Sequence, residues 1–545
     1  MSSVEQLELV LVLLTAALVL VMLARRVHLP PSVTLVLGRM GMGLIPGMPD
    51  IELDPDLVLL LFLPPLLVSG AYFTVWRDFR AELRVILQLA VGAVAFTTLV
   101  IGLAVHLVLP SLPWAACFTV GAILSPPDAV AAKAVLKGVP LPRRMVTLLE
   151  GESLVNDATG LVLFRVAVAA AMSGAFNAWD AVGSFALLSV GGVVVGFAFG
   201  QAATFVLARF REPHMVVTGT LLAAWGAYIA GDLLHVSGVL STVAAGLVFG
   251  WKQHEVLPAS VRRQAGAVWS VVVFLLESLI FILIGLSARD VSLVGASVGL
   301  GVGERFGAEG VTVWSLTIPV LVVFVAMTVA RFAWIVPAAY LPRLVSVALR
   351  RPALLPAPPF AVPVIMSWAG MRGVVSLAVA LSLPAGFPGR DVVLTITFAV
   401  VRLSILLQAT TLGSLIDWLR LGGSGPETRS TLDEAAARAL VAQAALDALR
   451  SHSLRPDGSH RHPRLMEQYT YRATASARFS QSAGQLAPDR AEHFQAVLHA
   501  NHAGRIKLLE LHRTARIHDS VLQVIETELD LEELGARQAI SPEVE

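Results

Sequence analysis

Residues 149–164 read LEGESLVNDATGLVLF, a stretch in which acidic and polar side chains stand at the head of an apolar segment. On a helix, Ser153 and Asp157 share one face at positions i and i+4, and Glu152 and Asn156 form a neighbouring pair. An ionisable side chain inside a membrane-spanning helix is costly and usually marks a functional site. The stretch therefore predicts a spanning helix that carries the polar centre of the protein.

The composition of the whole chain indicates a membrane protein. Of its 545 residues, 56% are hydrophobic and 14% are charged, and the mean hydropathy is +0.74. Soluble proteins carry about 25% charged residues, so this chain has too little polar surface for a soluble fold. The formal charge of +1 indicates no particular partner, and no nucleic-acid partner is expected.

The apolar residues occur in blocks long enough to cross a bilayer, and they predict an all-α polytopic membrane protein with about 13 transmembrane helices. The first block is expected to be a retained helix, because Arg25 and Arg26 follow it, whereas a secretory signal has basic residues first. The predicted spans are 5–24, 31–46, 56–75, 84–109, 114–136, 146–173, 181–208, 214–233, 237–251, 264–287, 312–341, 360–384 and 391–418.

Basic residues alternate along the loops between these spans. The loops after even-numbered spans hold only Arg289, Arg305 and Arg390. Loops rich in Lys and Arg stay on the cytoplasmic side, which places the N-terminus outside and the C-terminus inside the plasma membrane. The loops after odd-numbered spans hold Arg25, Arg26, Arg77, Arg80, Arg84, Lys137, Arg143, Arg144, Arg209, Arg211, Lys252, Arg262, Arg263, Arg343, Arg350 and Arg351.

The composition changes near residue 420, which divides the chain into a transmembrane domain (1–419) and a cytoplasmic helical tail (420–545). Helices are expected from Thr431 and over 490–513 and 517–535, with a linker over 451–464. The tail holds most of the 13 histidines. A solvated helical domain is the favoured interpretation, and a pH sensor or metal site is the alternative.

Two predicted spans are interrupted in their middle. Residues 124–130 read LSPPDAV, and the two prolines forbid a continuous helix before Asp128. Residues 367–376 read SWAGMRGVVS, with Arg372 between two glycines. Interrupted spans in corresponding positions of two halves are typical of inverted repeats that bind ions between them. The halves would be spans 1–6 and 8–13, with the seventh as a connector.

Carboxylate, amide and hydroxyl oxygens are the ligands that small hard cations prefer. Asp157, Asn156 and Ser153 supply all three kinds on one helix. The alternative is that these groups only hold helices together by hydrogen bonds, which is more plausible for Ser153 than for Asp157.

The string GESLVND at 151–157, with the Pro-Pro-Asp break before it and Gly-Met-Arg-Gly at 370–373 after it, resembles the cation/proton antiporter-1 family, particularly its bacterial sodium/proton exchangers. The resemblance runs over most of residues 10–420 and includes FLPPLL at 62–67 and SGVL at 237–240. It implies a homodimer in the lipid bilayer, in which a core part moves like an elevator against a dimerisation part.

The resemblance also assigns roles to residues. It implies that Asp157 carries either the cation or the proton, with Asn156, Asp128 and Ser153 in the same site. It implies a buried ion pair of Glu152 with Arg372. An asparagine at position 156, rather than an aspartate, resembles the electroneutral branch of the family.

Three residues depart from the family's pattern or lack a role in it. Pro127 stands where many members have a threonine, so one hydroxyl ligand is missing. Glu277 lies where relatives vary, and Arg402 interrupts the last span without an evident reason.

The predicted function is secondary active exchange of a monovalent cation, most plausibly Na⁺, for H⁺, by alternating access and competition at Asp157. The chain contains no GxxxxGK[ST] motif, so an ion gradient is the expected driving force. Cys117 is the only cysteine, which excludes an internal disulfide and a CxxC site. No cofactor is expected.

Other functions are weighed against this one. The alternatives are K⁺/H⁺ or broad monovalent cation exchange, and a gated cation channel. A hydrolase using Ser153 is disfavoured because no histidine lies near it in sequence, so the chain is not expected to be an enzyme.

Overall fold

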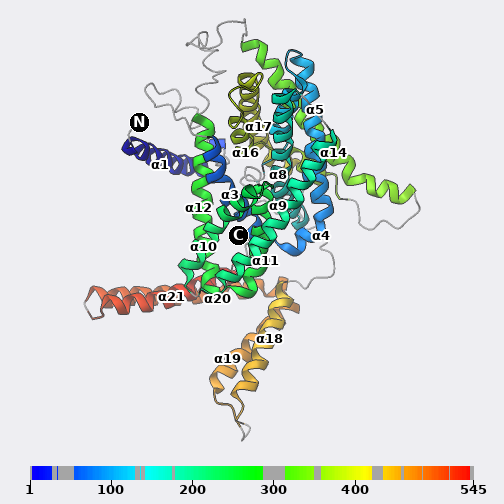
Figure 1. The fold of residues 1–545 in the computed structure, drawn as a ribbon. Helices are drawn as coiled ribbons and strands as arrows, with labels where there is room; N and C mark the ends of the chain where they lie inside the picture. Colours follow the sequence, from blue (N-terminus) through cyan, green and yellow to red (C-terminus); the bar gives the residue numbers. More distant parts are fainter. Residues whose placement is uncertain are drawn as a thin grey trace. The chain divides into compact units, whose positions relative to one another are not determined.

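The computed structural model describes residues 3–27, 33–34, 55–128, 136, 141–174, 178–210, 212–286, 313–348, 358–419, 434–455, 459–481, 483–514 and 516–540 (Figure 1). Within these residues every named element is a helix, and the only bridge of β type joins Leu454 to His460. The predicted all-helical fold class is confirmed. The chain divides into two compact units, Met1–Gly425 and Pro426–Glu545.

A helix lies over every predicted span except 31–46, of which the structure describes only residues 33–34. The helices of the first unit are α1 (Ser3–Val27), α3 (Pro55–Phe73), α4 (Trp76–Leu87), the π-helix η1 (Gln88–Ala93), α5 (Val94–Val108), α6 (Trp114–Leu124), α8 (Arg143–Ser173), α9 (Ala178–Leu207), α10 (Pro213–Leu233), α11 (Gly238–Val256), α12 (Ala259–Leu286), α14 (Val313–Ala348), α15 (Ala361–Trp368), α16 (Val374–Leu381) and α17 (Arg390–Trp418).

Six of the described helical stretches are long and apolar enough to cross a membrane. At a rise of about 1.5 Å per residue, each is at least about as long as the hydrocarbon core of a bilayer is thick, which is about 30 Å. They are Trp76–Val108, Arg144–Ser173, Ala181–Leu207, Pro213–Leu233, Leu316–Leu341 and Arg390–Trp418, and Leu14–Ala24, Leu60–Phe73 and Trp114–Leu124 are shorter apolar helices.

The fourth predicted span begins earlier than the sequence indicates. The prediction starts at residue 84, where the apolar run begins, whereas the helix starts at Trp76 and continues through η1 into α5. The added turns are amphipathic, because Phe79 and Ile86 are buried while Arg77 and Arg80 are exposed. An apolar-run criterion misses such turns.

Both predicted interruptions are present. Helix α6 ends at Leu124, and the chain between α15 and α16 is not helical. A backbone hydrogen bond of 2.7 Å joins the two breaks, from the N–H of Asp128 to the carbonyl of Met371. The second half of the fifth predicted span lies outside the described residues, apart from residue 136.

The second unit consists of two helical pairs, α18 (Glu434–Ser453) with α19 (Pro463–Gln481) and α20 (Ala483–Arg513) with α21 (Asp519–Ile540). The predicted tail helix over 490–513 lies within α20, the one over 517–535 begins two residues before α21, and the predicted start at Thr431 lies outside the described residues. The predicted linker over 451–464 is shorter in the structure, because α18 extends to Ser453 and α19 starts at Pro463.

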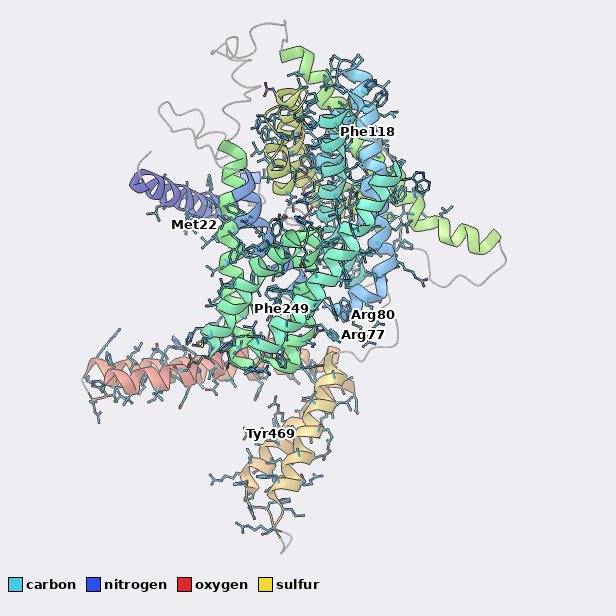
Figure 2. All side chains as sticks on the ribbon, viewed as in Figure 1. Met22, Arg77, Arg80, Phe118, Phe249 and Tyr469 are labelled. Atoms are coloured by element: carbon cyan, nitrogen blue, oxygen red, sulfur yellow. The ribbon has the colours of Figure 1, made fainter. Side chains whose placement is uncertain are left out.

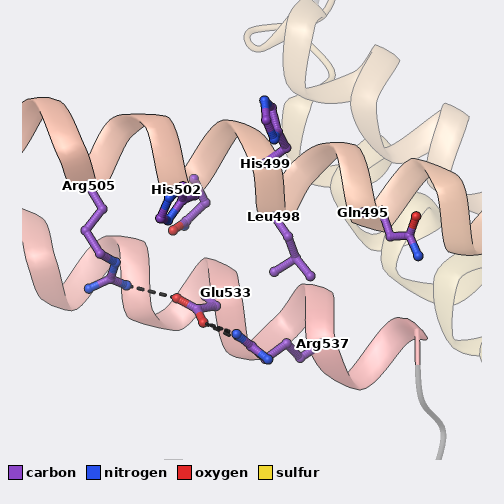
Figure 3. A pocket seen from close by; sticks show the side chains of 8 residues that line it. Gln495, Leu498, His499, His502, Arg505, Glu533 and Arg537 are labelled. Carbon is purple, nitrogen blue, oxygen red and sulfur yellow. Dashed lines mark hydrogen bonds and ion pairs between the residues drawn. The ribbon is translucent and has the colours of Figure 1, made fainter.

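Charged side chains tie α20 to α21 (Figure 3). Arg505 donates to Asp530 at 2.6 Å and to Glu533 at 3.0 Å, and Arg537 donates to Glu533 at 2.9 Å. The hydrogen bond from Arg537 is the main cause that lowers the pKa of Glu533, and the hydrogen bond to Asp530 raises the pKa of Arg505. Among the residues described in the tail and elsewhere, no group of three metal-binding side chains occurs, so the structure adds no support for a metal site.

Gly160 of α8 lets the ring of Pro126, at the first break, pack directly against α8. A Cβ atom at this position would overlap the ring of Pro126, which cannot rotate away. Glycine is therefore required here by space.

The substitution Gly160→Ala is expected to destabilise the protein by about 1–3 kcal/mol, the usual cost of overpacking. The measurement is the thermal midpoint of the purified protein in detergent. Gly183→Ala is the matched control, because a Cβ at Gly183 of α9 meets nothing within 4 Å. That variant should be neutral or slightly more stable, since alanine is the better helix former by up to about 1 kcal/mol. Equal midpoints for the two variants would contradict the packing described here.

Candidate functional site

The polar centre predicted from the sequence lies near the middle of α8. Glu152, Asn156 and Asp157 are buried there, and Ser153 is half-buried. α8 packs against α6, so these side chains lie beside the first break. The four predicted residues of α8 therefore lie within two turns of one helix, beside the first break.

Asn156 connects α8 to the break. Its Nδ2 donates to the carbonyl of Pro127 at 2.8 Å. That carbonyl lies three residues beyond Leu124, the last residue of α6. The Oδ1 of Asn156 is buried without a hydrogen-bond partner, so it presents an amide oxygen to the site.

Asp157 and Asp128 carry the site's two carboxyl groups. Asp157 is 8% exposed and Asp128 is half-buried, and their charges interact. A Cβ at Gly373 would overlap the carboxylate of Asp128. Asp128 therefore sits directly against the second break, and both breaks contribute to one polar region.

Arg372 is fully buried, and among the described residues no carboxylate forms an ion pair with it, although its charge interacts with that of Glu152 at longer range. Its Nε donates to the carbonyl of Leu124 and its Nη1 to the carbonyl of Gly370. Leu124 is the last residue of α6, and the carbonyls at a helix C-terminus carry partial negative charge. The charge of Arg372 therefore complements the end of the broken helix.

The backbone of Arg372 is fixed by α17. Its N–H donates to the hydroxyl of Ser404 at 3.0 Å, and that hydroxyl donates to Oε1 of Gln408 at 2.6 Å. Both side chains are buried. This chain of hydrogen bonds holds the non-helical segment between α15 and α16 in place.

The predicted ion pair of Glu152 with Arg372 is wrong, because Glu152 pairs with Arg331 of α14. The Nη1 and Nη2 of Arg331 lie 2.7 and 3.1 Å from the two carboxylate oxygens, and both side chains are at most 4% exposed. The Nη2 of Arg331 also donates to the carbonyl of Met366, near the end of α15, at 3.2 Å. Each buried arginine thus binds carbonyls at the end of one half-helix, and Arg331 binds the acid as well.

Arg331 was not predicted to belong to the site, although its position in the sequence indicates a functional role. Arg331 lies inside the apolar span 312–341, and an ionisable residue there indicates a function by the same rule that singled out Asp157. Arg372 was instead predicted to be the partner of Glu152, because it stands between two glycines in a motif. The spacing along the sequence gives no information on which helix faces Glu152.

A hydroxyl pair also lies at the first break. Thr98 of α5 donates to Oγ of Ser125 at 3.0 Å, and Ser125 donates to the carbonyl of Ala122 at 3.3 Å. Neither hydroxyl was predicted. Together they connect α5 to the end of α6.

The two charged residues without a predicted role differ in their surroundings. Arg402 of α17 has buried Nε and Nη2 atoms without a hydrogen-bond partner, and nothing in the structure explains them. Glu277 of α12 is half-buried.

Comparisons with known proteins show the family to which the chain belongs. Residues 11–418 match the family profile described as sodium/hydrogen exchanger, transmembrane. An uncharacterised Na⁺/H⁺ exchanger of Mycobacterium tuberculosis is 34% identical over 457 residues, covering 81% of this chain and 79% of the relative. A sodium, potassium, lithium and rubidium/H⁺ antiporter of Bacillus pumilus is 31% identical, covering 70% of this chain and 57% of the relative.

A solved structure has the same fold. The sodium/proton antiporter MjNhaP1 of Methanocaldococcus jannaschii superposes with a TM-score of 0.59 at 20% identity, covering 78% of this chain and 100% of the archaeal chain.

The pair of Glu152 and Arg331 is expected to be strongly coupled. Removing one charge leaves the other buried and unpaired, which costs about 3–5 kcal/mol, so Glu152→Gln and Arg331→Gln should each destabilise the protein strongly. The double variant should cost less than the sum. The measurement is a double-mutant cycle on the free energy of unfolding in detergent.

Glu82→Gln is the control for this cycle. It breaks the bidentate pair of Glu82 with Arg144, whose side chains are 19% and 42% exposed. The exposed pair should contribute only about 0–1 kcal/mol. A coupling of Glu152 with Arg372 that exceeds its coupling with Arg331 would contradict the assignment.

Proposed function

Because the chain belongs to the transmembrane sodium/hydrogen exchanger family, we propose that it exchanges Na⁺ for H⁺ across the plasma membrane at a site centred on Asp157. Asn156, Asp128 and Ser153 complete the proposed site. The chain acts as a transporter and catalyses no covalent chemistry.

One observation carries the proposal. Asp157 is a buried carboxylate in a membrane-spanning helix, and among the described residues no Lys, Arg or His forms an ion pair with it. Glu152, one turn away, has Arg331. A buried carboxylate that lacks a cationic side chain must take a proton or bind a cation. These are the two ions that the proposed exchange moves.

The oxygens around Asp157 suit a small hard cation. The free Oδ1 of Asn156, the carboxylate of Asp128 and the hydroxyl of Ser153 are oxygen ligands of the kind such cations prefer. One carboxylate cannot hold a proton and a sodium ion together, so the two compete. If the site opens to each side of the membrane in turn and crosses only when occupied, competition yields exchange.

The proposed opening of the site to each side in turn requires that the two helix breaks be stabilised within the protein. Arg372 and Asn156 bind carbonyls near the end of α6, and Arg331 binds Glu152 and the end of α15. These contacts let the non-helical segments remain at membrane depth without unsatisfied carbonyls. The proposal places the site where the two halves of an inverted repeat meet.

The wider organisation belongs to the same proposal. About 13 spans form two inverted repeats in residues 1–419, and residues 420–545 form a cytoplasmic helical tail, with the N-terminus outside. The protein works as a homodimer in which one part moves like an elevator. Sodium is the favoured cation because the names of most relatives carry it, and a flux series with Na⁺, Li⁺ and K⁺ tests the broader alternative.

Competition predicts a specific pH dependence. Once the pH falls well below the pKa of the site, each further pH unit should raise the apparent Km for sodium about tenfold for a single competing proton, without a matching loss of maximal rate. Asp157→Asn should abolish exchange, while Ser153→Ala should weaken sodium affinity and leave turnover. The measurement is sodium-dependent proton flux in proteoliposomes across a pH series.

Asp391→Asn is the control, because this exposed acid lies in the first turn of α17. It should exchange like the wild type. Exchange that persists in Asp157→Asn, or a Km that stays flat over several pH units, rules out Asp157 as the shared carrier.

The neutral side chain at Asn156 predicts electroneutral exchange. With one titratable acid fewer than an Asp-Asp pair, one proton per sodium ion is the simplest coupling. A transported net charge would change the energy of a step by about 2.3 kcal/mol per 100 mV. The exchange rate should therefore hardly change when a membrane potential is imposed. Net current on a solid-supported membrane, or a steep voltage dependence, would be inconsistent with this coupling.

A further inference from the structure

Helix α4 projects beyond the hydrocarbon core of the membrane. Trp76–Val108 is one continuous helical stretch of 33 residues, whose length is about 50 Å at 1.5 Å per residue. The hydrocarbon core is only about 30 Å thick. α5 carries no Asp, Glu, Lys or Arg, whereas α4 carries five such residues in the sequence WRDFRAELRVIL. The charged α4 is therefore the end that reaches the lipid headgroups.

Three arginines of α4 form one face of the helix. Arg77, Arg80 and Arg84 follow each other at i, i+3 and i+7, which aligns them on one side of the helix; Figure 2 labels Arg77 and Arg80. All three are exposed, and among the described residues none has an acidic partner. Glu82, the other acid of α4 besides Asp78, is occupied by Arg144. We call Arg77, Arg80 and Arg84 the basic face.

The surroundings of the basic face are apolar and aromatic. Phe73, Val75, Leu83 and Leu87, which lie close to these arginines in sequence, are exposed. Trp76 stacks on Phe79 and on Trp251 of α11, with ring centroids 6.0 and 6.1 Å apart. Aromatic rings gather at the boundary between the hydrocarbon and the headgroups, and long basic side chains there direct their charges to the headgroups.

We propose that the basic face binds the phosphate headgroups of anionic phospholipids. The guanidinium group binds phosphate oxygens with paired N–H donors, and three unpaired arginines on one face present several such groups together. An anionic leaflet attracts basic residues at its surface. The apolar side chains beside the basic face hold the acyl chains of the same lipids. These features favour a lipid over a soluble phosphate ligand.

The basic face is connected to the helix that carries the site. Glu82 lies between the arginines in sequence and forms two hydrogen bonds, of 2.8 and 3.0 Å, with Arg144 in the first turn of α8. Ile86 is fully buried and contacts Gly151, which precedes Glu152. Lipid bound to α4 therefore holds α8 from its first turn to the site. Its effect on exchange, unlike the binding itself, rests on the proposed function.

The test compares lipid binding by the wild type and by R77Q/R80Q/R84Q. Phosphatidylglycerol is titrated into protein in a neutral detergent, and the thermal midpoint and the lipid adducts in native mass spectrometry are recorded. Each arginine near an anionic surface strengthens binding roughly fivefold, so the triple variant should need on the order of a hundredfold more lipid. R464Q/R472Q/R478Q removes three exposed charges from α19 and should respond like the wild type.

Several outcomes decide the proposal. Loss of the response to phosphatidylglycerol in the α4 variant alone supports it, and R77K/R80K/R84K, which keeps the charges, should restore the response. An unchanged response in the α4 variant overturns it, as does an equal loss in the α19 variant. Stabilisation by inorganic phosphate as strong as that by phosphatidylglycerol also overturns it.

The connection to the site is tested separately in proteoliposomes. Wild-type exchange should be faster in vesicles with phosphatidylglycerol than in phosphatidylcholine alone, and the α4 variant should lose this difference. Equal rates in both vesicles, with lipid adducts intact, contradict the connection. If the wild type shows no exchange in any vesicle, the proposed function fails, while the adduct measurement still decides whether the basic face binds lipid.

Discussion

The donation from Arg372 to the carbonyl of Leu124 is the interaction on which the rest of the site depends. A helix that stops at membrane depth leaves carbonyls that neither water nor lipid can satisfy. Arg372 meets this need at the end of α6, and Asn156 does so at Pro127. With the break satisfied in this way, α8 can pack against it and bring its carboxylates to the interrupted segment.

The same need to bind carbonyls at the ends of half-helices explains why arginines are buried at the site. Among the residues that the structure describes, Arg331 and Arg372 are buried and each binds carbonyls at or near the end of a half-helix, but of these two only Arg331 also forms an ion pair with a described acid. Glu152 is therefore neutralised by the protein, while Asp157 is not neutralised by any described side chain. This asymmetry between two acids on one helix separates a structural role from a transport role. It also explains why α14, which contributes no predicted ligand, is needed for the site.

The sequence predicted much of this arrangement. Hydropathy located the spans, because a helix in lipid must be apolar over its whole length. The prolines at 126 and 127 located the first break, and the spacing in α8 placed Asn156 and Asp157 together. The partner of Glu152 could not be predicted from spacing, since the approach of α14 depends on packing between helices distant in sequence. The start of α4 was missed because its turns are amphipathic and lie outside the apolar run.

The central claim is that Asp157 holds either a proton or a sodium ion. Calorimetric titration of sodium into the purified protein, in buffers of different ionisation enthalpy, counts the protons that binding releases. At a pH about one unit or more below the pKa of the site, where the carboxyl group is mostly protonated, the wild type should release close to one proton for each sodium ion bound, the stoichiometry of a single shared carboxylate. Asp157→Asn should show neither sodium binding nor proton release. Sodium binding without proton release in the wild type, or release that persists in the variant, would contradict the account.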